Sequence, residues 1–176
     1  KILNPYFDLF NELALWRETS PPELMAVRRK LVAAYAWAVP SPEALEAIAA
    51  AGVAVLELGA GTGYWAFCLR QLRVDILAFD VNPAAPPHWS PVGAGTPETL
   101  LADPNSPLQV RALMLCWPPL AEPLAERALA LYRGDCVIEV GEGPGGKTGS
   151  DEFHRRLRAE WSLEREVELD RKSTRL

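Results

Sequence analysis

Three alternate glycines after a short apolar run limit what this chain can fold into more than any other feature. Residues Val53–Leu58 are β-friendly and apolar apart from Glu57, and Gly59, Gly61 and Gly63 follow. Such a run is typical of a strand covered on both faces, as in a parallel sheet between helices. Glycines adopt positive φ and let a ligand approach the backbone, beside the free N–H groups of a following helix. The stretch predicts a buried strand leading into a cofactor-binding turn, with a tight turn that binds nothing as the alternative.

Strand-like and helix-like segments alternate after this stretch. Strands are expected at residues 53–58, 74–79, 112–116 and 136–140, and helices at 63–72, 121–132 and 151–160. The alternation predicts an α/β fold with a doubly wound, mainly parallel sheet of Rossmann-like type. A short strand is expected at His88–Val92 and a weaker one at Glu164–Leu169, while Pro83–Pro87 is too rich in proline for regular structure.

The residues before the first strand predict a helical cover. Aromatic residues at helical spacing indicate a short helix within residues 1–19. Helix-start signatures follow at Ser20–Glu23 and Ser41–Glu43, and the first of these helices should run to about Ala38. We expect a single domain over residues 1–176, with 1–51 as the cover over a sheet edge or the cofactor site, 52–170 as the α/β core and 171–176 as a non-native tail.

Composition narrows the class of protein. With 49% hydrophobic and 23% charged residues the chain is typical of a soluble globular domain, and it has no apolar run of the roughly 20 residues that cross a membrane. We therefore expect a cytoplasmic protein. A net charge of −5 argues against general binding to nucleic-acid backbones. Cys68, Cys116 and Cys136 lack the short paired spacing of a zinc site, so we expect buried thiols and no metal.

Two cofactor classes place a glycine turn after the first strand, and the spacing separates them. A dinucleotide turn has glycine at the first, third and sixth positions, but the sixth position here is Tyr64, whose ring would crowd the pyrophosphate. Glycine instead occupies the first, third and fifth positions, and Glu57 lies two residues before the first. The stretch Glu57–Gly63 therefore resembles the first motif of class I S-adenosylmethionine-dependent methyltransferases.

Asp80 at the end of the second expected strand supports this resemblance. It should lie beside the glycine turn at the carboxyl edge of the sheet, where its two oxygens can accept both ribose hydroxyls of an adenosine. The resemblance implies that S-adenosyl-L-methionine is the cofactor, that Asp80 holds its ribose and that Glu57 orients the glycine loop. The other residues implied for this cofactor site are Gly59, Ala60, Gly61 and Gly63 along the methionine part, Val81 and Asn82 beside the adenine, and Tyr64 and Cys116.

The fourth expected strand leads into Cys116-Trp117-Pro118-Pro119-Leu120, where this class of methyltransferase meets its substrate. Members that methylate amines have Asn, Asp or Ser before the two prolines and an aromatic residue after them. Trp117 and Leu120 depart from that pattern, so adenine or cytosine methylation is not carried over. Trp117 is a candidate catalytic-site residue that walls the site or stacks on a planar substrate, with packing in the core as the alternative.

Four segments also resemble a narrower methyltransferase-like family. They are Tyr35–Pro40, Glu57–Trp65, Cys116–Pro119 and Gly141–His154. This resemblance covers about residues 30 to 160 and implies the fold without naming a substrate. A complete class I member ends in an antiparallel strand pair, so we expect a truncated C-terminal sheet edge in this chain.

The glycine-rich loop after the fifth expected strand is the second candidate for chemistry. Glu142, Lys147, Asp151 and His154 should lie at the carboxyl edge of the sheet, and we select Glu142 and His154 as candidate catalytic residues. His154 is a candidate general base. The alternative is that Asp151 starts a helix and His154 faces solvent or fills a gap. The spacing from Gly141 to Thr148 also fits a phosphate loop, but it follows the fifth strand rather than the first.

The sequence therefore predicts an S-adenosylmethionine-dependent methyltransferase whose acceptor, a small molecule or a nucleic acid, is unknown. Tyr35, Trp37, Tyr64 and Trp117 would supply aromatic walls that favour a sulfonium cation. Alignment of the reactants rather than a protein nucleophile would drive the transfer. The main alternative is a protein that binds S-adenosylmethionine or a related nucleoside without catalysis, and a nicotinamide oxidoreductase is disfavoured by Tyr64.

Overall fold

The structure, a computed structural model, describes residues 2–13 and 21–168. Its elements, in chain order, are α1 (Pro5–Leu13), α2 (Pro21–Ala34), α3 (Pro42–Ala50), β1 (Val55–Leu58), α4 (Tyr64–Gln71), β2 (Ile76–Asp80), β3 (Gly93–Ala94), α5 (Pro97–Leu101), β4 (Ala112–Cys116), α6 (Leu124–Leu131), β5 (Val137–Val140) and α7 (Asp151–Glu160). Within the described ranges, no helix is both long and apolar enough to span a membrane.

The five strands form one parallel sheet in the order β3-β2-β1-β4-β5. The central strand β1 places Glu57 opposite Ala78 on β2 and Met114 on β4. The chain builds outward from β1 to β3 and then returns to build β4 and β5 on the other side, so the order reverses between β1 and β4. Ligands of open α/β sheets bind outside the carboxyl ends of the strands at such a reversal. The predicted α/β, Rossmann-like architecture is confirmed.

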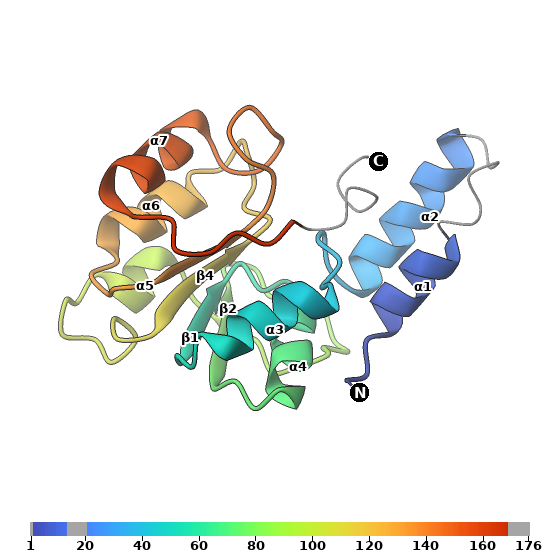
Figure 1. Cartoon of the computed structure of the whole chain (residues 1–176), viewed down its shortest axis with the longest axis horizontal. Helices are drawn as coiled ribbons and strands as arrows, with labels where there is room; N and C mark the ends of the chain where they lie inside the picture. Colours follow the sequence, from blue (N-terminus) through green and yellow to red (C-terminus); the bar gives the residue numbers. More distant parts are fainter. Residues whose placement is uncertain (1, 14–20, 169–176) are drawn as a thin grey trace.

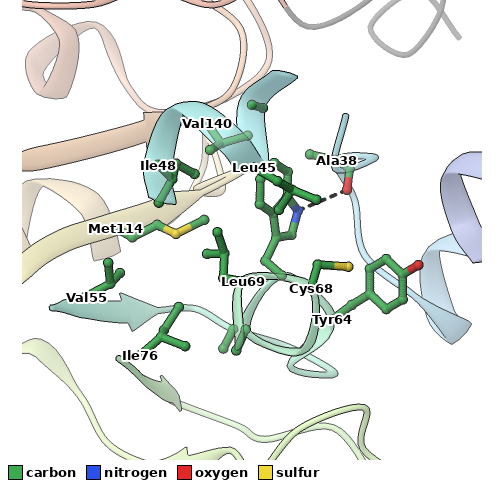
Figure 2. Packing of buried hydrophobic residues seen from close by; sticks show 14 of the residues in the cluster. Ala38, Leu45, Ile48, Val55, Tyr64, Cys68, Leu69, Ile76, Met114 and Val140 are labelled. Carbon is green, nitrogen blue, oxygen red and sulfur yellow. Dashed lines mark hydrogen bonds between the residues drawn. The ribbon is translucent and has the colours of Figure 1, made fainter. Parts of the chain in front are cut away.

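Helices cover both faces of the sheet, with α3 and α4 on one and α5, α6 and α7 on the other (Figure 1). Successive side chains of β1 point to opposite faces of the sheet. Val55 lies in the apolar cluster under α3 and α4, and Leu56 lies in the cluster under α5, α6 and α7. Figure 2 shows the first cluster, where Leu45 and Leu69 pack around Val55 and Met114. Each such fully buried side chain contributes about 1.5–3 kcal/mol relative to an exposed one. The strand β1 is therefore packed against apolar side chains on both faces.

The helices α1 and α2 lie beside each other to one side of the sheet (Figure 1) and are joined to its glycine turn. The indole N–H of Trp89 donates to the carbonyl oxygen of Ala34 at 2.7 Å, and the Thr62 hydroxyl donates to that of Tyr35. The ring of Tyr6 on α1 stacks on Tyr35 with the centroids 4.8 Å apart. The N-terminal cover thus contacts the turn through Tyr35, and it contacts Trp89 through the end of α2.

One detail of the N-terminal prediction is confirmed and another is wrong. Ser41 caps α3 as predicted, since its hydroxyl accepts the N–H of Ala44 at 3.1 Å. The preceding helix was expected to reach about Ala38, but α2 ends at Ala34. Its last carbonyl oxygen bonds to Trp89 instead of to a further helical turn. The expected cap Ser20 lies outside the described residues.

Both minor strands were predicted wrongly. His88–Val92 is irregular, and the edge strand is Gly93–Ala94. Pro87 and Pro91 border or interrupt the expected strand and have no N–H to donate to a ladder. Residues 164–168 of the strand expected at 164–169 also have no regular structure, because only Val167 among them packs against the core. The tail expected at residues 171–176 lies outside the described residues.

Candidate functional site

The three glycines of the turn all have positive φ, at 83° for Gly59, 54° for Gly61 and 75° for Gly63, and they flank the buried Ala60. A side chain is strained in this conformation, so all three positions favour glycine. Their surroundings differ. A Cβ on Gly63 would lie 2.8 Å from the carbonyl oxygen of Ser90, whereas one on Gly61 would meet no atom within 4 Å. Gly63 therefore serves close packing, and Gly61 borders open space from which a ligand can approach the backbone.

Asp80 joins the glycine turn to the end of β2. Its Oδ2 accepts the N–H of Gly61 at 2.8 Å, and its Oδ1 accepts the N–H of Asn82 at 2.8 Å. Each carboxylate oxygen has further lone pairs, so these two bonds leave acceptor capacity for a ligand. Val81 and Asn82 follow as exposed residues. The structure thus brings the predicted ribose residue and its two neighbours next to the turn.

Glu57 is a buried acid whose charge the nearby Arg70 compensates only in part. It is 1% exposed, and its Oε2 has no hydrogen-bond partner among the described residues. Burial, and then the charge of Asp80, raise the pKa of Glu57 to about 8 against the opposing effects of the Ala66 backbone and of Arg70. The Arg70 guanidinium is directed elsewhere, to the Ser90 hydroxyl at 2.5 Å and to the backbone of β2. Nothing in the sequence indicated that Arg70 would affect the pKa of Glu57.

Tyr64, which replaces the third glycine of a dinucleotide turn, lies inside the protein with 0% exposure. Its hydroxyl accepts the N–H of Tyr6 at 3.0 Å and donates to Oδ1 of Asn4 at 2.8 Å. Its ring meets that of Trp89 edge-on, with the centroids 5.0 Å apart. In this structure Tyr64 therefore joins the N-terminal segment to α4 and presents no surface to a ligand. Asn4 has no surrounding motif that could have revealed its role.

The loop after β4 has an unusual backbone at the carboxyl edge of the sheet. Cys116 ends the strand, and burial, with the nearby charge of Glu57, raises the pKa of its thiol well above the ordinary value. Trp117 follows with a φ of 53°, which is uncommon for a residue with a side chain. Its N–H donates to the carbonyl oxygen of Val140 at 2.6 Å, and its half-buried ring packs against the first cluster. Trp117 is thus in the core and partly open at the site edge, so both roles considered for it stay open.

The glycine-rich loop after β5 is closed onto the loop after β4. Thr148 forms an isolated antiparallel bridge with Pro119. Glu142 closes the loop on itself, because its Oε2 accepts the N–H of Lys147 at 2.5 Å and its own N–H donates to the Thr148 hydroxyl at 2.7 Å. In this conformation Glu142 therefore holds the loop, and its predicted catalytic role stays untested.

His154 lies under this loop and is 3% exposed. Its Nε2 lies 2.7 Å from the carbonyl oxygen of Thr148, which can only accept, so Nε2 carries the hydrogen. Its Nδ1 faces Oε1 of Glu139 at 3.6 Å. Burial raises the pKa of Glu139, and the charge that His154 can carry opposes this. The imidazole has almost no surface for a substrate here, so a general-base role would require the loop to open. Asp151 is exposed at the start of α7, as the structural alternative predicted.

The ends of β1, β2 and β4 thus bring together Glu57, the glycine turn, Asp80–Asn82 and Cys116–Trp117, and Glu142 and His154 belong to the neighbouring end of β5. In comparisons with known proteins, no family model, curated protein or solved structure matches the chain. Any functional proposal therefore depends on the site itself.

Proposed function

We propose that this chain binds S-adenosylmethionine at the glycine turn and transfers its methyl group to an acceptor. One combination at the sheet's topological reversal carries the proposal: the left-handed backbone of Gly61 borders open space, and the buried Oε2 of Glu57 lacks a partner. A ligand with a cationic amino acid part and a ribose fits this combination. The carboxylate of Glu57 would pair with the positive charge, and Asp80 would accept the ribose hydroxyls. Gly61 would allow the ligand to approach the backbone closely.

Different residues would bind the cofactor and align the reactants. When bound, S-adenosylmethionine supplies an electrophilic methyl group for a substrate nucleophile. Asp80 would accept the ribose hydroxyls with the lone pairs that its bonds to the turn leave unused. In its ionised form Glu57 would attract positive charge strongly, because it lies in a poorly solvated part of the site. Trp117 would border the acceptor. The chain would thus act by holding the reactants in line and excluding water.

A second candidate function is binding of S-adenosylmethionine or a related nucleoside without catalysis. It is favoured by the state of the predicted catalytic residues, since Glu142 and His154 both bond within the loop that follows β5. Trp117 also stands where amine-methylating enzymes have a polar residue. Dinucleotide binding is less well supported, because the buried ring of Tyr64 occupies the position of the third glycine.

Binding is tested with two aspartates at opposite ends of β2. Asp80 ends the strand at the glycine turn, and Asp75 precedes it and pairs with Arg111 at 2.8 Å. Calorimetry should find that Asp80→Ala weakens S-adenosylmethionine binding about 5- to 150-fold, which corresponds to about 1–3 kcal/mol for lost buried hydrogen bonds. Asp75→Ala should leave the affinity unchanged. Equal affinity of wild type and Asp80→Ala would refute the ribose assignment.

Catalysis needs a separate assay. Purified protein is incubated with methyl-labelled S-adenosylmethionine and either a small-molecule extract or an RNA pool. The enzyme proposal predicts label in one of these fractions, and the loss of most of that label with Asp80→Ala. Tight binding without label in either fraction would favour the non-catalytic alternative.

A further inference from the structure

Glu57 is buried beside a second acid, and the one cation that acts on its pKa among the described residues, Arg70, does not outweigh burial and the charge of Asp80. Its carboxyl is 1% exposed and Oε2 has no hydrogen-bond partner. The titratable groups around it are Asp80 at the end of β2, Cys116 at the end of β4, and Cys68 and Arg70 on α4. The helix α3, which packs on the same cluster, contributes apolar side chains.

These neighbours favour a protonated acid. A second carboxylate raises the cost of ionising Glu57, and so does removal from water. Arg70 opposes this, but its guanidinium bonds to Ser90 and to the backbone of β2. A cation placed against Oε2 would reverse the balance, because opposite charges attract strongly where water is scarce.

We infer that Glu57 carries a proton when the site is empty and exchanges it for the positive charge of a bound ligand, so that binding releases one proton. The inference rests on the proposed function. In this exchange the carboxyl O–H bond breaks, the proton passes to the buffer, and the carboxylate pairs with the cationic group of the ligand. The pKa of Glu57, which burial raises to about 8, agrees with a neutral acid at pH 7. Glu57 would thereby select charged nucleosides over neutral ones.

The test is calorimetry of the whole chain with S-adenosylmethionine at pH 6 and pH 7, in two buffers with different ionisation enthalpies. In this range the α-amino group of the ligand stays mostly protonated, since its ordinary pKa is about 7.7–8.0. The difference in heat between buffers counts the protons released. We expect about one proton at both pH values and a Kd about tenfold higher at pH 6 than at pH 7. Adenosine, a neutral probe, should bind without releasing a proton.

Two variants separate Glu57 from other groups. Glu57→Gln should bind S-adenosylmethionine with no proton release and no pH dependence, while Glu139→Gln, which alters the partly buried acid on β5, should behave like wild type. If Glu57→Gln does not fold, the difference in proton release between S-adenosylmethionine and adenosine, measured on the wild-type chain, still tests the inference.

The possible failures are distinguishable. Binding of S-adenosylmethionine without proton release, equal release with adenosine, or release that persists in Glu57→Gln would overturn the inference and leave the proposed function standing. If S-adenosylmethionine does not bind at either pH, both the inference and the proposed function fall.

Discussion

Glu57 on β1 and Glu139 on β5 are both acids within apolar strands, and each has one buried oxygen without a hydrogen-bond partner. Their neighbours differ. Glu139 faces Nδ1 of His154 at 3.6 Å, whereas the nearby charge of Asp80 makes ionisation of Glu57 harder still. The β5 region, residues 139–154, thus has a potential cation of its own. Beside the glycine-turn region, residues 57–63 and 80–82, the guanidinium of Arg70 bonds to Ser90 and to the backbone of β2, and Oε2 of Glu57 keeps no hydrogen-bond partner.

Both regions contain tightly packed and open glycines, so single positions can be compared between them. Gly63 combines a φ of 75° with close contact to Ser90, so neither its backbone nor its surroundings accept a side chain easily. Gly143 in the β5 region has no atom within 4 Å of a Cβ and no positive φ. Gly149 of the β5 region is as tight as Gly63, with a φ of 62° and a Cβ position 2.5 Å from Phe153, so the contrast lies between individual positions such as Gly63 and Gly143. The predictions below use these contrasts, from the largest expected effect to the smallest.

The largest effect concerns stability against pH. The folded pKa of Glu57 is about 8 and its ordinary value is 4.5, so between these values the folded state binds the extra proton. The contribution of Glu57 to the free energy of unfolding should therefore fall as pH rises from about 4.5 to about 8, by about 3–5 kcal/mol. Urea denaturation of wild type and Glu57→Gln at pH 5, 6.5 and 8 measures it. Parallel curves for the two proteins would contradict the assignment. Glu139→Gln should remove a smaller slope, because His154 opposes the shift there.

The same Gly→Ala substitution at one glycine of each region tests how well that position tolerates a side chain. Gly63→Ala should lower the free energy of unfolding by about 2–4 kcal/mol, since it adds backbone strain and a clash with Ser90 and Val92. Gly143→Ala should change it by less than about 0.5 kcal/mol. Thermal and urea unfolding compare the two. Similar losses for both variants would mean that strain and crowding at Gly63 do not set the cost of adding a side chain there.

The role of His154 gives the third prediction. His154→Ala removes the contact with Thr148 and leaves the partly buried Glu139 beside a gap, so it should cost about 1–3 kcal/mol of stability. The affinity for S-adenosylmethionine should stay within about twofold of wild type, because the contacts of His154 lie in the β5 region. Arg155→Ala, which removes an exposed ion pair with Glu152 on the same helix, is the control and should change little. A large loss of affinity with intact stability would place His154 in the binding site.

The sequence was most informative where residue type dictates backbone geometry or burial. The unbroken apolar strands and the glycines at alternate positions predicted the sheet and the turn, because few other structures suit such residues. Asp80 could also be found, since it ends a strand that is adjacent to the turn in this fold. Trp117 was identified by its place after β4, but its positive φ and its bond to Val140 leave no local signature.

Long-range partners could not be predicted in this way. His154 was expected at the site because it follows β5, yet the loop folds back and buries it against Thr148 and Glu139. Tyr64 was expected to line the cofactor, but the N-terminal segment covers it through Asn4 and Tyr6. Glu139 did leave a signal, because a lone acid in an apolar strand is the same pattern that drew attention to Glu57.

The central claim is that the glycine turn is built for a cationic adenosine ligand and not for a dinucleotide. The most direct measurement is calorimetry of the wild-type chain at pH 7 with S-adenosylmethionine and with NAD in parallel. The account predicts saturable binding of S-adenosylmethionine and at least tenfold weaker binding of NAD. Tighter binding of NAD, or no heat with S-adenosylmethionine, would contradict it.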